Sequence, residues 1–121
     1  MIIQDPIRKI RVFYFVVMSK KKKETREKFR NDVFSRDKNK CRKCGKANCE
    51  LDAHHITDRN EMPNGGYVRE NGISLCEDCH YNAEVWHSSN KTEHVDGFHP
   101  NDLYELIKSN YELAYKKSLL L

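Results

Sequence analysis

Two Cys-x-x-Cys pairs, Cys41 with Cys44 and Cys76 with Cys79, constrain the fold of this chain more than any other feature. Four thiolates satisfy zinc tetrahedrally and leave no open position, so the two pairs predict one structural zinc site. One ion would close both ends of the segment between the pairs. The alternative is two unrelated pairs of reactive or buried thiols. Cys49 is expected to be a spare thiol, with replacement of one zinc ligand as the alternative.

Size and composition favour a metal staple. The chain has 121 residues, of which 33% are charged, and a mean hydropathy of −0.86. These values predict one small domain with a modest core, the kind that often needs a metal ion. The apolar run at residues 12–18 lacks a signal cleavage site and is too short to cross a bilayer. We therefore expect an intracellular protein in a reducing compartment, with no membrane partner.

Positive charge is concentrated in one part of the chain. Residues 20–46 contain thirteen Lys or Arg and four acidic residues, although the whole chain has a net charge of only +4. A basic block beside an acidic remainder is typical of a nucleic-acid contact. A solvated charged helix is the alternative interpretation.

Periodicity and turn signals predict a small α+β fold. Residues 1–18 are an N-terminal extension of uncertain status, in which the aromatic and β-branched run at residues 11–18 favours a strand. One hypothesis is that residues 1–17 are dispensable, which a chain beginning at Met18 would test. The elements expected after the extension are a helix at 19–36, strands at 51–56 and 67–75 joined by a loop at 57–66, and helices at 77–85 and 101–115.

The histidines suggest a catalytic centre. Consecutive side chains of a strand leave on opposite sides, so His54 and His55 suit different tasks, one binding a metal ion and the other handling a proton. His80 follows the second cysteine pair on a helix and can supply another ligand. Glu84, one helical turn later, is a ligand, a partner that orients His80, or a surface carboxylate. Arg59 is a phosphate contact or a loop surface charge.

The order of these residues resembles the HNH endonucleases, whose active site is a ββα-metal (His-Me finger) unit. HHITDR, GGY, ENGISLC and CxxCH are similar to the zinc-containing form found often in phages and prophages, across residues 29–84. The resemblance implies that His54 and His80 bind a catalytic divalent ion. It implies that His55 is the general base, and that Asn71 holds the strand–loop geometry and orients His55. It also implies a bacterial or phage-infected host cytoplasm.

Two positions depart from the family pattern. The residue before the base is frequently Asp in that family, whereas this chain has His54. Some members carry a further histidine four residues after the one that matches His80, where this chain has Glu84.

The function implied by the resemblance is metal-dependent hydrolysis of DNA phosphodiesters, with low sequence specificity and with 5′-phosphate and 3′-hydroxyl products. Magnesium or manganese is favoured as the catalytic ion, with nickel or zinc as alternatives. RNA stays open as a substrate, and cutting both strands would need a homodimer or two nicks. Activity is expected to fall as the pH drops through about 6.5, because the base and ligands must be neutral. The alternative function is a non-catalytic zinc module that binds nucleic acid or a protein.

The domain boundaries follow from the same interpretation. Residues 19–88 are expected to form the nuclease domain with a basic N-terminal helix. Residues 89–121 are expected to be a C-terminal loop and helix packed on that domain.

Overall fold

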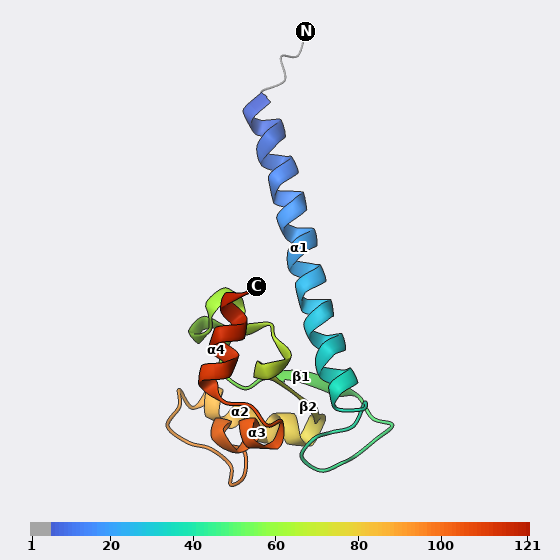
Figure 1. The fold of residues 1–121 in the computed structure, drawn as a ribbon, viewed down its shortest axis with the longest axis vertical. Helices are drawn as coiled ribbons and strands as arrows, with labels where there is room; N and C mark the ends of the chain where they lie inside the picture. The colour runs from blue at the N-terminus through green and yellow to red at the C-terminus, as the bar shows by residue number, and fades with distance from the viewer. Residues whose placement is uncertain (1–5) are drawn as a thin grey trace.

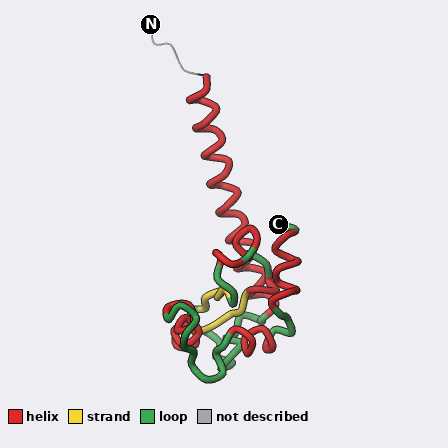
Figure 2. The backbone as a smooth tube through the Cα atoms, turned by 90° about the vertical axis from the view of Figure 1, so that its left-hand side faces the viewer, coloured by secondary structure: helices red, strands yellow, loops and turns green. Residues whose placement is uncertain are grey.

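The computed structural model describes the backbone of residues 6–121 and the side chains of residue 17 and residues 19–121. It is a small α+β fold with one two-stranded sheet and four α-helices in the described chain (Figure 1). The elements are α1 (Pro6–Arg36), β1 (Leu51–His55), β2 (Gly72–Cys76), α2 (Glu77–Ser88), α3 (Pro100–Leu106) and α4 (Tyr111–Leu119). The first part of α1 extends away from the body, whereas the other elements lie together around its C-terminal end (Figures 1 and 2).

The sheet positions the two central histidines. β1 and β2 pair antiparallel, with His54 opposite Ile73 and His55 opposite Gly72. Every residue of β2 is buried, and α1 and α2 both contact the two strands. The second strand, predicted at residues 67–75, was too long, because the 3-10 turn at Arg69–Asn71 occupies part of that range and β2 begins only at Gly72. The loop predicted at residues 57–66 contains two further 3-10 turns, Arg59–Glu61 and Pro63–Gly66, and Asn64 and Gly65 within it have positive φ.

The strand predicted at residues 11–18 is wrong, because α1 runs unbroken from Pro6 to Arg36. The sequence in this run favours β structure by propensity alone, which is a weak preference. Extending an existing helix adds one hydrogen bond per residue without a new nucleation step, so the helix predicted at residues 19–36 continues through the run. In the described part of the chain, no helix combines the length and the apolar character needed to cross a membrane.

The end of α1 packs tightly on the sheet at a glycine. Phe29 and Val33 are both buried on the face of α1 that meets β2. A Cβ atom at Gly72 would lie 2.5 Å from Val33 Cγ2 and 2.7 Å from the Phe29 ring. Only a residue without a side chain therefore allows α1 to approach the strand this closely.

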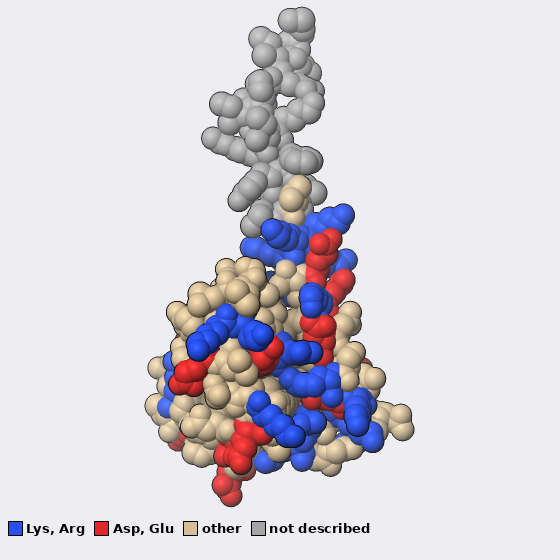
Figure 3. Space-filling model, viewed as in Figure 1, with Lys and Arg blue, Asp and Glu red and all other residues tan. Residues whose placement is uncertain are grey.

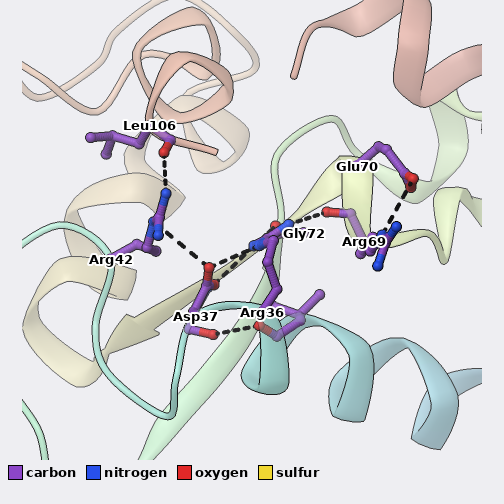
Figure 4. Close-up of polar contacts among 9 residues, drawn as sticks. Arg36, Asp37, Arg42, Arg69, Glu70, Gly72 and Leu106 are labelled. Atoms are coloured by element: carbon purple, nitrogen blue, oxygen red, sulfur yellow. Dashed lines mark hydrogen bonds and ion pairs between the residues drawn. The ribbon is translucent and has the colours of Figure 1, made fainter. Parts of the chain in front are cut away.

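A buried carboxylate fixes the last turn of α1. Arg36 donates from Nε and Nη2 to the two oxygens of Asp37, each at 2.8 Å, and from Nη2 to the Gly72 carbonyl at 2.7 Å (Figure 4). The Ser74 amide donates to Asp37 Oδ2 at 2.9 Å. Two parallel charge-assisted bonds of this kind compensate the burial of the carboxylate. The network joins the helix end to the middle of β2.

The helix predicted at residues 101–115 is two helices. Lys108 has φ of +54°, and Asn110 caps α4 by accepting from the Leu113 amide at 2.8 Å. The side-chain cap offers the backbone a new helix start, so the chain turns instead of continuing straight. The main core lies between the sheet, α2 and these two helices. Its buried residues are Cys41, Ile56, Met62, Ile73, Leu75, Cys76, Cys79, Ala83, Phe98, Leu103, Tyr104, Ile107 and Ala114.

Candidate active site and zinc centre

The four predicted zinc ligands come together. The sulfur atoms of Cys41, Cys44, Cys76 and Cys79 all lie within 4.8 Å of one another. Cys44 Sγ and Cys76 Sγ are 3.7 Å apart. In a tetrahedron with Zn–S bonds of about 2.3 Å the sulfur atoms lie about 3.8 Å apart, so the spacing fits zinc. The fifth cysteine, Cys49, is outside the cluster, with its thiol 3.8 Å from the Lys46 carbonyl.

Local backbone geometry forms the first half of this cluster. The Gly45 amide donates to the Cys41 carbonyl and the Cys41 amide to the Lys46 carbonyl, which closes a tight turn around the first pair. Burial alone would raise the pKa of the Cys41 thiol, but the surrounding backbone amides outweigh it and lower the pKa to about 6. The thiolate, which is the zinc-binding form, is thus favoured at this residue.

A second cluster of ligand-type atoms lies between β1 and α2. His54, His80 and Glu84 bring ligand atoms within 4.8 Å of one another. Glu84 Oε1 is 3.2 Å from His54 Nδ1 and 3.1 Å from His80 Nε2. The other nitrogen of His80 is 3.1 Å from Asp52 Oδ2. A carboxylate behind a histidine in this way fixes the ring and increases its basicity as a ligand.

The cluster fits a divalent cation. His54 is almost fully buried, and its Nδ1 has no hydrogen-bond partner among the described residues, although a Glu84 oxygen lies 3.2 Å from it. An orphaned buried nitrogen is costly unless a ligand satisfies it. Neighbouring ligands about 2.1 Å from an ion in an octahedral shell lie about 3.0 Å apart, close to the spacings of Glu84 to the two imidazoles. These imidazoles also lower the pKa of the Glu84 carboxyl, which keeps it anionic.

His55 lies on the other side of β1 from His54. Its ring stacks on Phe29 of α1, with ring centroids 4.5 Å apart, and meets the edge of Tyr67 at 4.8 Å. Its Nε2 atom is buried and has no hydrogen-bond partner among the described residues. Burial, with a smaller contribution from the Arg59 charge, lowers the pKa of His55 to about 4. The imidazole is therefore neutral at physiological pH and can accept a proton.

Asn71 fastens the loop that follows β1. Its side chain accepts from the Thr57 amide at 2.9 Å and donates to the carbonyls of Thr57 and Gly66. Tyr104 of α3 donates to the same side-chain oxygen at 2.8 Å, and burial raises the pKa of Tyr104 to about 12, so this donor stays protonated. Asn71 is completely buried, and the contacts described for it are with this loop and α3.

Two neighbouring cavities, which share several lining residues, adjoin the side chains on the two faces of β1. A cavity of about 320 Å³ is lined by His54, His55, Arg59, His80 and Glu84, together with Ala53, Asp58 and His87. A neighbouring cavity of about 510 Å³ shares His55, Arg59 and His80. Arg59 is exposed and donates to the Tyr67 hydroxyl at 3.2 Å. The side chains on the two sides of β1 can therefore act on one bound group.

Sequence reasoning overlooked several residues of this site. Asp52 supports His80, and His87 Nε2 donates to the His55 carbonyl at 3.1 Å. Both lie at positions that the expected elements already indicated: Asp52 shares a face of β1 with His54, and His87 follows His80 by two helical turns. Phe29 and Tyr67 are the two aromatic neighbours of His55. Tyr67 belongs to the GGY motif but was given no role there, and Phe29 is distant from His55 in sequence.

Comparison with known proteins supports one family. Residues 41–84 match the model of the family described as HNH endonuclease. No curated protein and no solved structure matches the chain. The matched segment contains the cysteine cluster and the cluster of His54, His80 and Glu84. The match indicates a nuclease-type or nucleic-acid-binding function, and it fits the separate cysteine and histidine sites seen in the structure. Residues 41–84 of the chain thus match the HNH endonuclease family, and this segment holds four cysteines arranged as a zinc site would require.

Proposed function

We propose that this protein is a metal-dependent endonuclease that hydrolyses DNA phosphodiester bonds with little sequence preference. The observation that carries the proposal is the arrangement of His55 beside the cluster of His54, His80 and Glu84, with one hollow in contact with all four. An unpaired neutral imidazole next to a set of metal-type ligands suits hydrolysis of a phosphate ester.

Each side chain has a separate role in the proposed reaction. His54, His80 and Glu84 would hold the divalent ion, which when bound neutralises charge on the phosphate and the leaving 3′ oxygen. His55 takes a proton from the attacking water, whose oxygen forms the new bond to phosphorus as the bond to the 3′ oxygen breaks. The departing 3′ oxygen takes a proton from solvent and His55 later releases its proton to solvent, which leaves a 3′-hydroxyl and a 5′-phosphate. Arg59 is within reach of the same hollow and would contact the phosphate.

The positioning residues keep the base in place. Phe29 packs flat on the His55 ring, and the His87 side chain donates to the His55 carbonyl. Asn71 acts through the loop after β1, since its hydrogen bonds end at Thr57 and Gly66. We therefore assign Asn71 the role of fixing the backbone beyond the strand. Small displacements of a base cost rate steeply, so these packed neighbours matter for the reaction.

A plasmid assay tests the function. Supercoiled DNA incubated with the zinc-loaded protein should be nicked when magnesium, manganese, nickel or zinc is added, and should remain intact when the added ion is omitted. Nicks with a 5′-phosphate and a 3′-hydroxyl can be sealed by DNA ligase without prior treatment. Nicks that ligase cannot seal would contradict the proposed direction of cleavage.

Metal counting separates the proposal from a non-catalytic zinc module. The nuclease requires one tightly held zinc and a second divalent site that involves His54 and His80. One zinc and no second site, together with intact plasmid in every ion, would identify a binding module. Cleavage of RNA in place of DNA under the same conditions would keep the chemistry and change the substrate.

The dependence of activity on pH is expected to have two parts. The low pKa of His55, about 4, keeps the base active well below the value of about 6.5 expected for an ordinary histidine. Glu84 and Asp52 instead raise the pKa of His80 against its partial burial, so protons compete with the ion at this ligand. As the pH falls, metal binding should be lost first and base function last.

This order can be measured as pH–rate profiles at two magnesium concentrations. Limiting magnesium should give a fall in rate that begins above pH 6.5, and saturating magnesium should move that fall toward pH 4. A fall near pH 6.5 that does not move with magnesium would show that burial does not control the base.

A further inference from the structure

Part of the basic block serves the fold. Arg36 binds the buried Asp37, and Arg42 reaches the same carboxylate at 3.7 Å and donates to the Leu106 carbonyl (Figure 4). These two arginines are engaged by the protein, so they are poorly placed to attract a duplex. Lys and Arg also gather along the described part of α1, with acidic residues between them (Figure 3).

Two arginines of α1 differ from this pattern. Arg26 and Arg30 line the 510 Å³ cavity together with His55, His80 and Arg59. On the opposite face of α1, Lys28 forms an ion pair with Asp32 at 2.6 Å. Among the described residues, no carboxylate lies within ion-pair distance of Arg26 or Arg30. The wall that α1 contributes to this cavity thus carries two arginines without an ion-pair partner among the described residues, and Asp52 of β1 lines the cavity as well.

A third arginine, Arg59, lies in the same cavity close to Tyr67. The guanidinium groups of Arg59 and Arg26 both lie at the Tyr67 hydroxyl, where they lower the pKa of Tyr67 although burial acts to raise it. Like charges gathered around one neutral group repel one another unless an anion joins them. An arginine fork matches the oxygen atoms of a phosphate group, which makes phosphate the anion that fits.

The positive wall continues along the helix. A second hollow of about 530 Å³ is lined by Lys22, Lys23, Arg26 and Arg30, with Ser19 and Glu27. This hollow shares Arg26 and Arg30 with the 510 Å³ cavity beside His55, so the two hollows form one continuous surface. Positions 22, 26 and 30 are one helical turn apart and span about 12 Å of helix axis. Phosphates of one DNA strand rise about 3.4 Å per nucleotide, so this span corresponds to a few nucleotides.

We propose that the basic face of α1, defined by Lys22, Arg26 and Arg30, binds the phosphates of the DNA strand that flank the bond to be cut. The DNA strand would leave the 510 Å³ cavity at Arg26 and Arg30 and follow α1 toward Lys22. This inference rests on the proposed function, because the cleaved phosphate fixes where the strand starts. The proposed DNA contact is thereby limited to one face of α1 and no longer includes all basic residues at positions 20–46.

Two matched double variants test the assignment. R26A/R30A removes two charges from the basic face, and K21A/K28A removes two charges from the opposite face of the same helix. Binding of a labelled duplex without added divalent ion is measured by fluorescence anisotropy at several salt concentrations. R26A/R30A should weaken binding on the order of 100-fold, about tenfold per charged hydrogen bond lost. The slope of log affinity against log salt should fall by about 2.

K21A/K28A should bind within a few-fold of the unchanged protein and keep its salt slope. In the nicking assay, R26A/R30A should raise KM far more than it lowers kcat, because the ligands and the base are untouched. Equal losses in the two double variants, or none in either, would overturn the assignment. Absence of nicking by the unchanged protein in every ion would instead refute the proposed function, and the binding contrast would still decide the role of this face.

Discussion

Replacing His55 with alanine is expected to reduce divalent-dependent nicking by a factor on the order of 10² to 10⁴, the usual contribution of a general base. The structure gives the reason: the imidazole is buried, held neutral by a pKa of about 4, has an unpaired Nε2 among the described residues, and shares a hollow with His54, His80 and Glu84. The measurement is the initial rate of plasmid nicking at saturating magnesium.

The matched control is His94→Ala, which removes an exposed histidine whose ring contacts Trp86 and His99, away from the site. This variant should nick at the rate of the unchanged protein. H55A should still unfold cooperatively and bind one zinc, since neither property depends on the base. Nicking by H55A at the control rate would remove His55 from the reaction and leave the metal cluster to be explained in another way.

Loss of one zinc ligand is expected to unfold the domain. Replacing Cys79 with serine leaves three sulfur ligands in a core that contains Cys41, Cys76 and Cys79 among its buried residues. Structural zinc sites contribute about 10–16 kcal/mol of apparent binding free energy. Domains of ordinary stability have only about 5–15 kcal/mol, so a large loss of zinc affinity removes the folded state. C79S should therefore show no cooperative thermal transition by circular dichroism.

Cys49 provides the control for this experiment, because its thiol is outside the cluster, 3.8 Å from the Lys46 carbonyl. C49S should keep one zinc per chain by elemental analysis and melt at the temperature of the unchanged protein. A C79S variant that melts like C49S would show that the cysteine cluster does not stabilise the fold through an ion. Zinc loss from C49S would instead place Cys49 in the coordination shell.

The sequence predicted the centre of the fold because its signals are local. The spacing of the cysteine pairs and the alternation along β1 depend on neighbouring residues, so the zinc cluster and the separation of His54 from His55 could be read directly. Glu84 stayed ambiguous for a different reason. Its spacing from His80 fits an exposed helix face equally well, and only the approach of β1 to α2 brings it to His54.

Other features depend on tertiary contacts that no local pattern encodes. Asp37 directly follows the helix predicted at residues 19–36, yet it is a buried carboxylate held by Arg36 and the Ser74 amide. The N-terminal run was assigned to a strand by residue preference, but the cooperativity of α1 decides its structure. The division of the domain at residues 18, 88 and 121 stays a prediction.

Two of the residues that support the site come from outside the matched segment, one on each side. Phe29, on α1, stacks on its ring, and Tyr104, on α3, donates to Asn71, which holds the loop after β1. Residues 41–84 alone therefore lack two side chains that support the site. A graft of residues 41–84 into another scaffold would transfer the proposed ligands and base without Phe29, which stacks on His55, and without Tyr104, which donates to Asn71. A graft meant to keep the proposed activity would therefore have to include both flanking segments.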